Sequence, residues 1–139
     1  GNSIYFDLSG GNGGNGGNGG DGGDGKDGDI KNEKMRRVGD AGNGGNGGNG
    51  GNGGNAGNLN LYIHENCAAI ESFLTTKTNG GRYGSRGMGG KRGTPGSALA
   101  GQQAGRQGFP GANGVEGFKG MDGSVQRYIR SFDYAVYKN

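Results

Sequence analysis

The sequence has few of the residues that usually hold a small protein together. Its 139 residues include one cysteine, Cys67, two prolines, Pro95 and Pro110, and no tryptophan. A single cysteine excludes a disulfide within the chain and leaves a free thiol or a bridge between two chains. Hydrophobic residues, with glycine not counted, make up 27% of the sequence, which leaves few large side chains to bury. A conventional hydrophobic core is therefore out of reach for most of the chain.

Long apolar runs and a strong net charge are also missing. No stretch of about 20 apolar residues is present, so we expect no membrane span. The sequence does not open with a basic segment followed by an apolar one, so we expect that any secretion signal has already been removed. The net charge of +3 is small, and the basic residues are scattered. Since no platform for stacking bases accompanies them, we expect no nucleic-acid partner.

Glycine dominates what remains, with 40 residues arranged at a period of three. In the run Gly10–Gly28 every third residue is glycine, and a second glycine follows it in nearly every triplet. The remaining position holds Asn12, Asn15, Asn18, Asp21, Asp24 and Asp27. A period of three is that of a polyproline-II helix, which has no internal hydrogen bonds. Such a helix needs partners outside itself.

Three further runs supply candidate partners: Gly39–Gly57, Gly81–Gly96 and Gly105–Gly123. The first two runs have equal lengths, which predicts an antiparallel pair. Their two glycine edges permit close backbone approach, and we expect the Asn and Asp edge to face water. The last two runs have one glycine edge each, so we expect both at the outside. The predicted fold is mostly irregular and polyproline-II, with a bundle of four antiparallel glycine-rich three-fold helices.

Two other structures were weighed for these runs. Gly-rich, low-complexity sequence is often disordered, but we interpret the glycine as structural. Gly105–Gly123 also has the glycine spacing of collagen. Collagen takes its stiffness from a high density of imino acids, and this chain has two prolines, so we favour bundling within one chain.

Apolar residues gather in three segments, 3–8, 59–77 and 125–137, which predict a small antiparallel β base. Segment 3–8 alternates, with Ile4, Phe6 and Leu8 on one face. Residues 59–67 alternate in the same way, and residues 68–78 are ambiguous between helix and strand. We interpret them as a return strand, with a hairpin turn near 65–69. In the last segment Tyr128, Phe132, Tyr134 and Val136 share a face. Base and helices together predict a single domain, 1–139.

The fourth run carries an apolar stripe along one edge. Phe109, Val115, Phe118 and Met121 follow one another at multiples of three residues. A stripe on an outer helix needs a cover, either from this chain or from another subunit. We expect another subunit. The predicted assembly interface consists of this stripe with Ile4, Phe6, Leu8, Tyr128, Phe132, Tyr134 and Val136.

Two connections without the triplet pattern, 29–38 and 97–104, are expected at the end opposite the β base. The first is basic, and its candidate contact residues are Lys31, Lys34, Arg36 and Arg37. The glycine runs resemble those of polyglycine-II and polyproline-II bundle proteins, namely the snow-flea antifreeze proteins and the glycine-rich adhesins of phage tail fibres. The resemblance lies in the period of the four runs alone. It implies a helix bundle, and by analogy with the adhesins it implies binding loops at the tip.

No catalytic constellation is present, so we predict no enzyme and no cofactor. His64 and Cys67 are three residues apart, which places them on opposite faces of a strand. Asp27, Asp29 and Asp40 are the one cluster that merits consideration for calcium, and we predict no metal site. No phosphate-binding loop of the form G-x-x-x-x-G-K-[ST] occurs.

These observations leave three functional hypotheses. The first is a structural subunit of an extracellular filament, which assembles with copies of itself by sharing β strands and burying the apolar stripe. The second is an adhesin at a phage or fibre tip, in which loops 29–38 and 97–104 bind a cell-surface receptor. The third is an ice-binding protein, which would need a flat regular face. We favour the filament.

Overall fold

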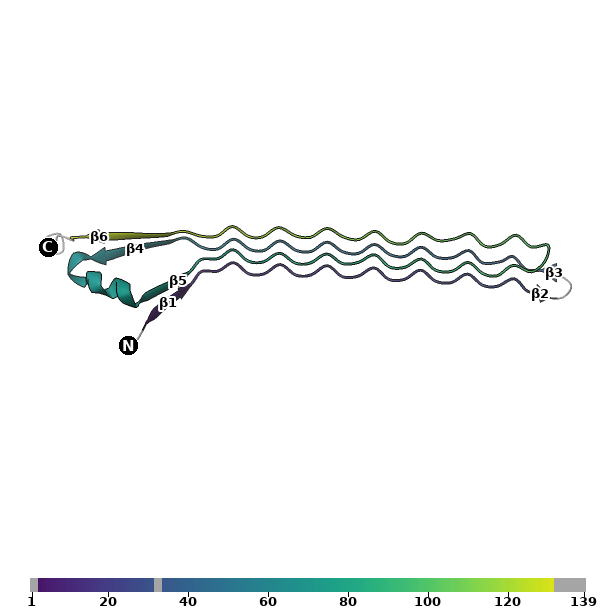
Figure 1. Cartoon of the computed structure of the whole chain (residues 1–139), viewed down its shortest axis with the longest axis horizontal. Helices are drawn as coiled ribbons and strands as arrows, with labels where there is room; N and C mark the ends of the chain where they lie inside the picture. Colours follow the sequence, from purple (N-terminus) through teal and green to yellow (C-terminus); the bar gives the residue numbers. More distant parts are fainter. Residues whose placement is uncertain (1–2, 32–33, 132–139) are drawn as a thin grey trace, which may run out of the picture. The chain divides into compact units, whose positions relative to one another are not determined.

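The structure is a computed structural model and describes residues 3–31 and 34–131, with the side chains of residues 34 and 35 left aside. Most of this chain is neither helix nor strand, as the composition predicted. The regular elements are short (Figure 1). They are β1 (Ile4–Asp7), β2 (Ile30–Lys31), β3 (Lys34–Met35), β4 (Leu59–His64), the 3-10 helix η1 (Glu65–Phe73), β5 (Leu74–Lys77) and β6 (Val125–Arg130).

The chain forms two compact units. Unit 1 comprises Gly1–Gly13, Asn52–Arg82 and Phe118–Asn139, and unit 2 comprises Gly14–Gly51 and Tyr83–Gly117. Unit 1 contains β1, β4, η1, β5 and β6 together with the adjoining ends of the glycine runs. Unit 2 contains the middle of each run, the pair β2–β3 and the connection 97–104. Each unit therefore contains parts of all four runs.

The β base of unit 1 is parallel, so the prediction of an antiparallel base is wrong. β1 pairs with β5 from Ile4 opposite Leu74 to Asp7 opposite Lys77, and β4 pairs with β6. The cause lies in the stretches that lead from the strands into the glycine runs. Leu8 N–H donates to the Lys77 carbonyl and Gly10 N–H donates to the Asn79 carbonyl, so these two stretches run in the same direction. Strands that continue such stretches must also be parallel.

Helix η1 replaces much of the predicted hairpin. Residues 65–73 form a 3-10 helix, and only Leu74–Lys77 forms the expected return strand. That strand pairs with β1 and not with β4. His64 begins the helix, since its Nδ1 accepts a hydrogen bond of 3.1 Å from the Asn66 N–H. Ile70 and Phe73 lie on this helix, and Leu74 begins the strand that follows it.

Apolar burial in unit 1 is slight. β4 alternates as predicted, with Leu59 and Leu61 half-buried and Ile63 only 5% exposed. In β1, Phe6 and the following Leu8 are half-buried, whereas Ile4 is 43% exposed. The predicted face of the last segment continues past β6, and its residues Phe132, Tyr134 and Val136 lie outside the described residues.

In unit 2 the glycine segments lie side by side and bond to one another through their backbones (Figure 1). Gly48 N–H donates to Gly17 and Gly45 N–H donates to Gly20, so the partner number falls as the donor number rises. The first and second segments therefore run in opposite directions. Gly16 N–H donates to Ser85 and Gly19 to Met88, so the first and third segments run in the same direction.

The third segment bonds to every other segment. Within unit 2 the Ser85 carbonyl accepts from Gly16 of the first segment, Gly84 N–H donates to Gly51 of the second, and the Gly84 carbonyl accepts from Gly117 of the fourth. The prediction that segments with one glycine edge lie outside is therefore wrong for the third segment. One buried glycine per triplet is enough, because the two other side chains of each triplet point outward.

The two connections in unit 2 are held together by side chains. In β2–β3, Ile30 lies opposite Met35 and Lys31 opposite Lys34 in an antiparallel pair. Val38, at the end of this connection, is only 3% exposed. The connection 97–104 turns through Gly101, whose φ of 83° is the left-handed conformation that glycine adopts without strain.

Candidate functional site

The Asn and Asp residues of the first two segments form a ladder of hydrogen bonds. The Asn15 side-chain oxygen accepts from Ser85 N–H at 2.9 Å, and the next residue, Gly16, donates its N–H to the Ser85 carbonyl at 2.8 Å. We call this two-bond unit a clamp. The same unit recurs at Asn12, Asn18, Asp21, Asp24, Asp27, Asp40, Asn43, Asn46, Asn49, Asn52, Asn55 and Asn58.

The ladder corrects the expectation that these side chains face only water. Ser85 and the other clamped residues have side chains, which turn outward and leave the backbone N–H facing the neighbouring segment. That N–H needs an acceptor, and glycine offers no side chain to provide one. An Asn or Asp in the facing triplet provides it, and its remaining polar atoms stay exposed.

In the first segment the carboxylates form the shorter clamps. Asp21, Asp24 and Asp27 each accept a backbone N–H at 2.7 Å, whereas Asn12, Asn15 and Asn18 accept theirs at 2.9 Å. A shorter bond is expected when the acceptor carries a charge. The Thr94 N–H and hydroxyl both donate to Asp24, and these bonds lower the pKa of the Asp24 carboxyl. In unit 1 the pKa of Asp122 is lowered by the Gly80 N–H and by the Lys119 ammonium.

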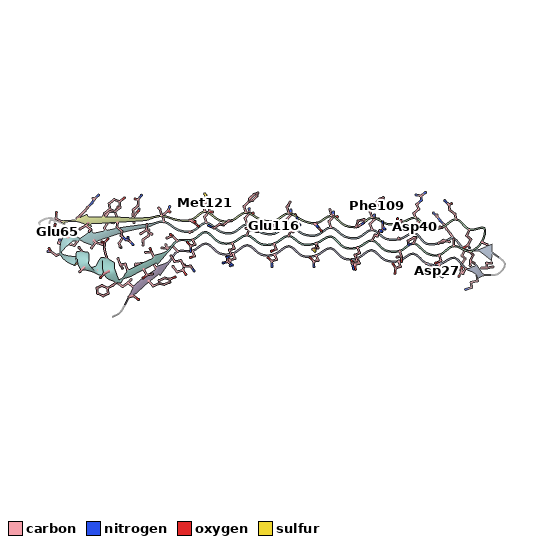
Figure 2. The ribbon with its side chains drawn as sticks, viewed as in Figure 1. Asp27, Asp40, Glu65, Phe109, Glu116 and Met121 are labelled. Atoms are coloured by element: carbon pink, nitrogen blue, oxygen red, sulfur yellow. The ribbon has the colours of Figure 1, made fainter. Side chains whose placement is uncertain are left out.

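The apolar stripe of the fourth segment is uncovered within the described chain. In unit 2, Phe109 is 73% and Val115 is 64% exposed, and in unit 1, Phe118 is 77% and Met121 is 70% exposed. Phe109 and Met121 project away from the ribbon (Figure 2). Their clamps explain why, since the Phe109 N–H and carbonyl both bond to the second segment, at Asn43 and Gly44. With its backbone held inward, each stripe side chain must point outward.

Unit 1 also offers open strand edges. Within the described residues, β1 pairs only with β5 and β4 only with β6, so each sheet has two strands. The predicted interface residue Tyr128 is half-buried, because it stacks on Tyr62 of β4 with ring centroids 4.9 Å apart. The Arg130 guanidinium lies 5.5 Å from the Tyr128 ring centroid and 5.7 Å from that of Tyr62. Tyr128 is thus engaged within its own sheet.

Unit 2 contains a hollow between the two connections. Its volume is about 370 Å³, and its walls include Arg36, Arg37, Asp40, Gln102 and Arg106. Gln102 joins the two connections, because its Nε2 donates to the Arg36 carbonyl at 2.9 Å while its Oε1 accepts from Leu99 N–H at 3.0 Å. The hollow is therefore enclosed by segments that are tied to each other.

Two of the predicted loop residues line this hollow and two do not. Arg36 and Arg37 lie in its wall, Lys31 is exposed in β2, and Lys34 lies in β3. Sequence reasoning missed Gln102 and Arg106. Arg106 lies three residues before Phe109, on the same edge of the fourth segment as the apolar stripe. The triplet spacing therefore grouped it with the stripe and not with the loop residues. Gln102 lies in a connection without a repeat, and no pattern pointed to it.

The three aspartates considered for calcium, Asp27, Asp29 and Asp40, each have other partners in the described chain. Asp27 is engaged in a clamp, Asp29 lies 4.0 Å from Arg36, and Asp40 accepts from Arg106 N–H. Within residues 3–31 and 34–131, no three His, Cys, Asp or Glu side chains come together in a group that would hold a metal ion. Cys67 is exposed on η1. No helix in the described residues is long and apolar enough to span a membrane.

Comparison with known proteins adds no assignment, since no family model, no curated protein and no solved structure matches this chain.

Proposed function

We propose that this protein is a non-enzymatic structural subunit that assembles with copies of itself outside the cell. Its glycine segments act as antiparallel three-fold helices of the polyproline-II type, resembling the polyglycine-II bundle proteins. The observation that carries the proposal is the exposure of large apolar side chains on the fourth segment, with Phe109, Phe118 and Met121 each at least 70% exposed. Exposed apolar groups of this kind mark contact surfaces between proteins.

Strand edges in unit 1 support the same function. A two-stranded sheet is marginally stable alone, and its unpaired edges accept further strands. The edges of β1–β5 and β4–β6 are therefore available for strands from another subunit, in addition to the apolar contact. Contacts of this kind that do not close on themselves build filaments.

The test compares two double variants by light scattering and negative-stain electron microscopy. Phe118→Ser with Met121→Ser removes two stripe side chains, and Tyr83→Ser with Met88→Ser removes two exposed apolar side chains of the third segment. We expect filaments from the wild type and the control, and small particles from the stripe variant. Deletion of residues 1–8 should also prevent filaments if β1 is shared.

Monomers of wild-type protein at all concentrations would contradict the proposal. Loss of assembly in both double variants would contradict a specific role of the stripe, because general surface stickiness would then suffice.

A second function is favoured by the paired connections. The Gln102 bond to Arg36 makes one surface of loops 29–38 and 97–104, which suits receptor binding by an adhesin. The ice-binding hypothesis gains less, because the oxygens of the Asn ladder accept bonds from the chain itself. It stays a weaker prediction.

A further inference from the structure

The hollow between the two connections has the size and charge of a binding site. Its volume of about 370 Å³ lies within the range of small-molecule sites, roughly 300–1,000 Å³. Three arginines, Arg36, Arg37 and Arg106, and one acidic residue, Asp40, line the hollow. Three positive charges against Asp40 and the neighbouring Asp29, which lies beside Arg36, leave a net charge of +1 at the hollow.

The single carboxylate is already engaged. Asp40 Oδ1 accepts from Arg106 N–H at 2.8 Å, and its Oδ2 lies 4.0 Å from a terminal nitrogen of Arg37. Arg36 lies 4.0 Å from Asp29. The Arg106 guanidinium has no acceptor among the described residues, although its backbone is fixed in a clamp. Because the Arg106 backbone is already fixed, binding a ligand through its guanidinium costs little additional conformational entropy.

The other residues that line the hollow suit a ligand with a sugar-sized polar ring. Val38 is buried beneath the hollow and supplies an apolar surface, while Gln103 adds an amide that can donate and accept. Guanidinium groups bind carboxylate and sulfate oxygens in a two-pronged geometry. We propose that this hollow binds a sugar-sized ligand that carries a carboxylate or a sulfate, with Arg106 as the main contact. The inference rests on the second candidate function, receptor binding, for its biological purpose.

The first experiment measures binding to the full chain by NMR titration with three probes: sodium sulfate, glucuronate and neutral glucose. We expect saturable shifts at Arg106 and Gln103 with one or both anions and none with glucose. Sulfate and glucuronate act as separate arms that identify the preferred oxyanion. Arg106→Gln should weaken binding by roughly 10-fold or more, the effect of losing a hydrogen bond to a charged group.

The matched control is Arg92→Gln, which removes the same charge from an exposed site in unit 2 outside the hollow. Equal weakening in both variants would overturn the proposal, because it would show general attraction of anions. Absence of saturable binding by either anion would overturn it as well.

A separate experiment tests the receptor function. It compares the adhesion to cells of the wild type with that of a chain whose residues 29–38 are replaced by a neutral loop. Adhesion lost on loop replacement, without anion binding by the wild type, would overturn the anion site and leave the receptor function standing. Anion binding with unchanged adhesion would support the site and contradict the receptor function.

Discussion

Neighbouring glycines in the first segment have opposite surroundings. A Cβ atom at Gly16 would lie 2.1 Å from the Gly48 carbonyl oxygen, a distance that no real contact allows, whereas a Cβ atom at Gly17 would meet nothing within 4 Å. Both glycines belong to the same triplet repeat, and the sequence treats them alike. Only at Gly16 does the backbone of a neighbouring segment occupy the space where a side chain would be.

Alanine substitutions should therefore separate the two positions. We expect Gly16→Ala to lower the free energy of unfolding by about 3 kcal/mol or more, the upper end for overpacking, because backbone atoms block the new methyl group. Gly17→Ala should raise it by about 0.4–1 kcal/mol, because alanine restricts the unfolded chain without a clash. Thermal unfolding monitored by circular dichroism measures both changes. Equal destabilisation by the two variants would contradict the observed packing.

At the scale of an element, the clamps hold the segments in a single register. The first and third segments are offset by 70 residues, from Asn15 with Ser85 to Asp27 with Ser97, and the second and fourth by 66, from Asp40 with Arg106 to Asn49 with Val115. In unit 1, β1–β5 and β4–β6 have the same two offsets. A slip of one residue in either direction would place a residue without a side-chain oxygen, glycine in most triplets, where each acceptor is needed, so the Asn and Asp period rules out such a slip.

Acid should weaken the clamps that contain aspartate. The hydrogen bonds from Thr94 lower the pKa of Asp24 in the folded chain below its ordinary value of about 3.9. A lowered pKa adds stability above that value, and the addition is lost as the pH falls through the folded pKa. Asp24→Asn keeps the acceptor oxygen but removes the charge, so this variant should melt below the wild type at pH 7, and the difference in melting temperature should shrink as the pH falls through the acid range.

The comparison needs a carboxylate outside the ladder. Glu116 is exposed and accepts no hydrogen bond within the described chain, so Glu116→Gln is the matched substitution of a carboxylate outside the ladder. Figure 2 shows Glu116 on the same segment as Phe109 and Met121. A gap between Asp24→Asn and the wild type that does not change with pH would count against a charge-assisted clamp.

At the scale of the whole molecule, backbone hydrogen bonds replace a hydrophobic core. Val38 and Ile63 are the buried hydrophobic residues of the described chain, and large apolar side chains such as Tyr5, Tyr62 and Phe73 are about half exposed or more. What each segment hides from water is mainly peptide groups and glycine. Stability therefore depends on the hydrogen bonds between segments. It also depends on the small conformational entropy that short Asn and Asp side chains lose when they become ordered.

This composition predicts an unusually small heat-capacity change on unfolding. Newly exposed apolar surface raises the heat capacity and exposed polar surface lowers it, with an ordinary sum of about 12–15 cal/mol/K per residue. We expect less than half of that sum, roughly 6 cal/mol/K per residue or less. Differential scanning calorimetry of the Phe118→Ser, Met121→Ser variant, which we expect not to assemble, measures it without a contribution from dissociation. A value in the ordinary range would mean that much more apolar surface is buried.

The period of three was the strongest pattern in the sequence, and it marked the four glycine runs that bond to one another in the structure. Glycine runs, apolar strand segments and two connections all lie where composition changes, and the outward face of Phe109 and Phe118 was predictable from their spacing. These features are local, because they follow from which residues share one edge of a repeat.

Tertiary structure alone decided which edges meet. The clamps at Asn15 and Asn46 and the parallel pairing of β1 with β5 each depend on a partner about 70 residues away, and the bonds of the third segment to Gly51 and Gly117 also join residues that are distant in the sequence. A triplet period indicates which edge of its own segment a residue lies on. It does not identify the segment that packs against that edge. The hollow between the connections shows the same limit, since Gln102 and Arg106 belong to no shared motif with Arg36. Contacts between distant segments arise from the packing of the backbone, and no single run of sequence encodes that packing.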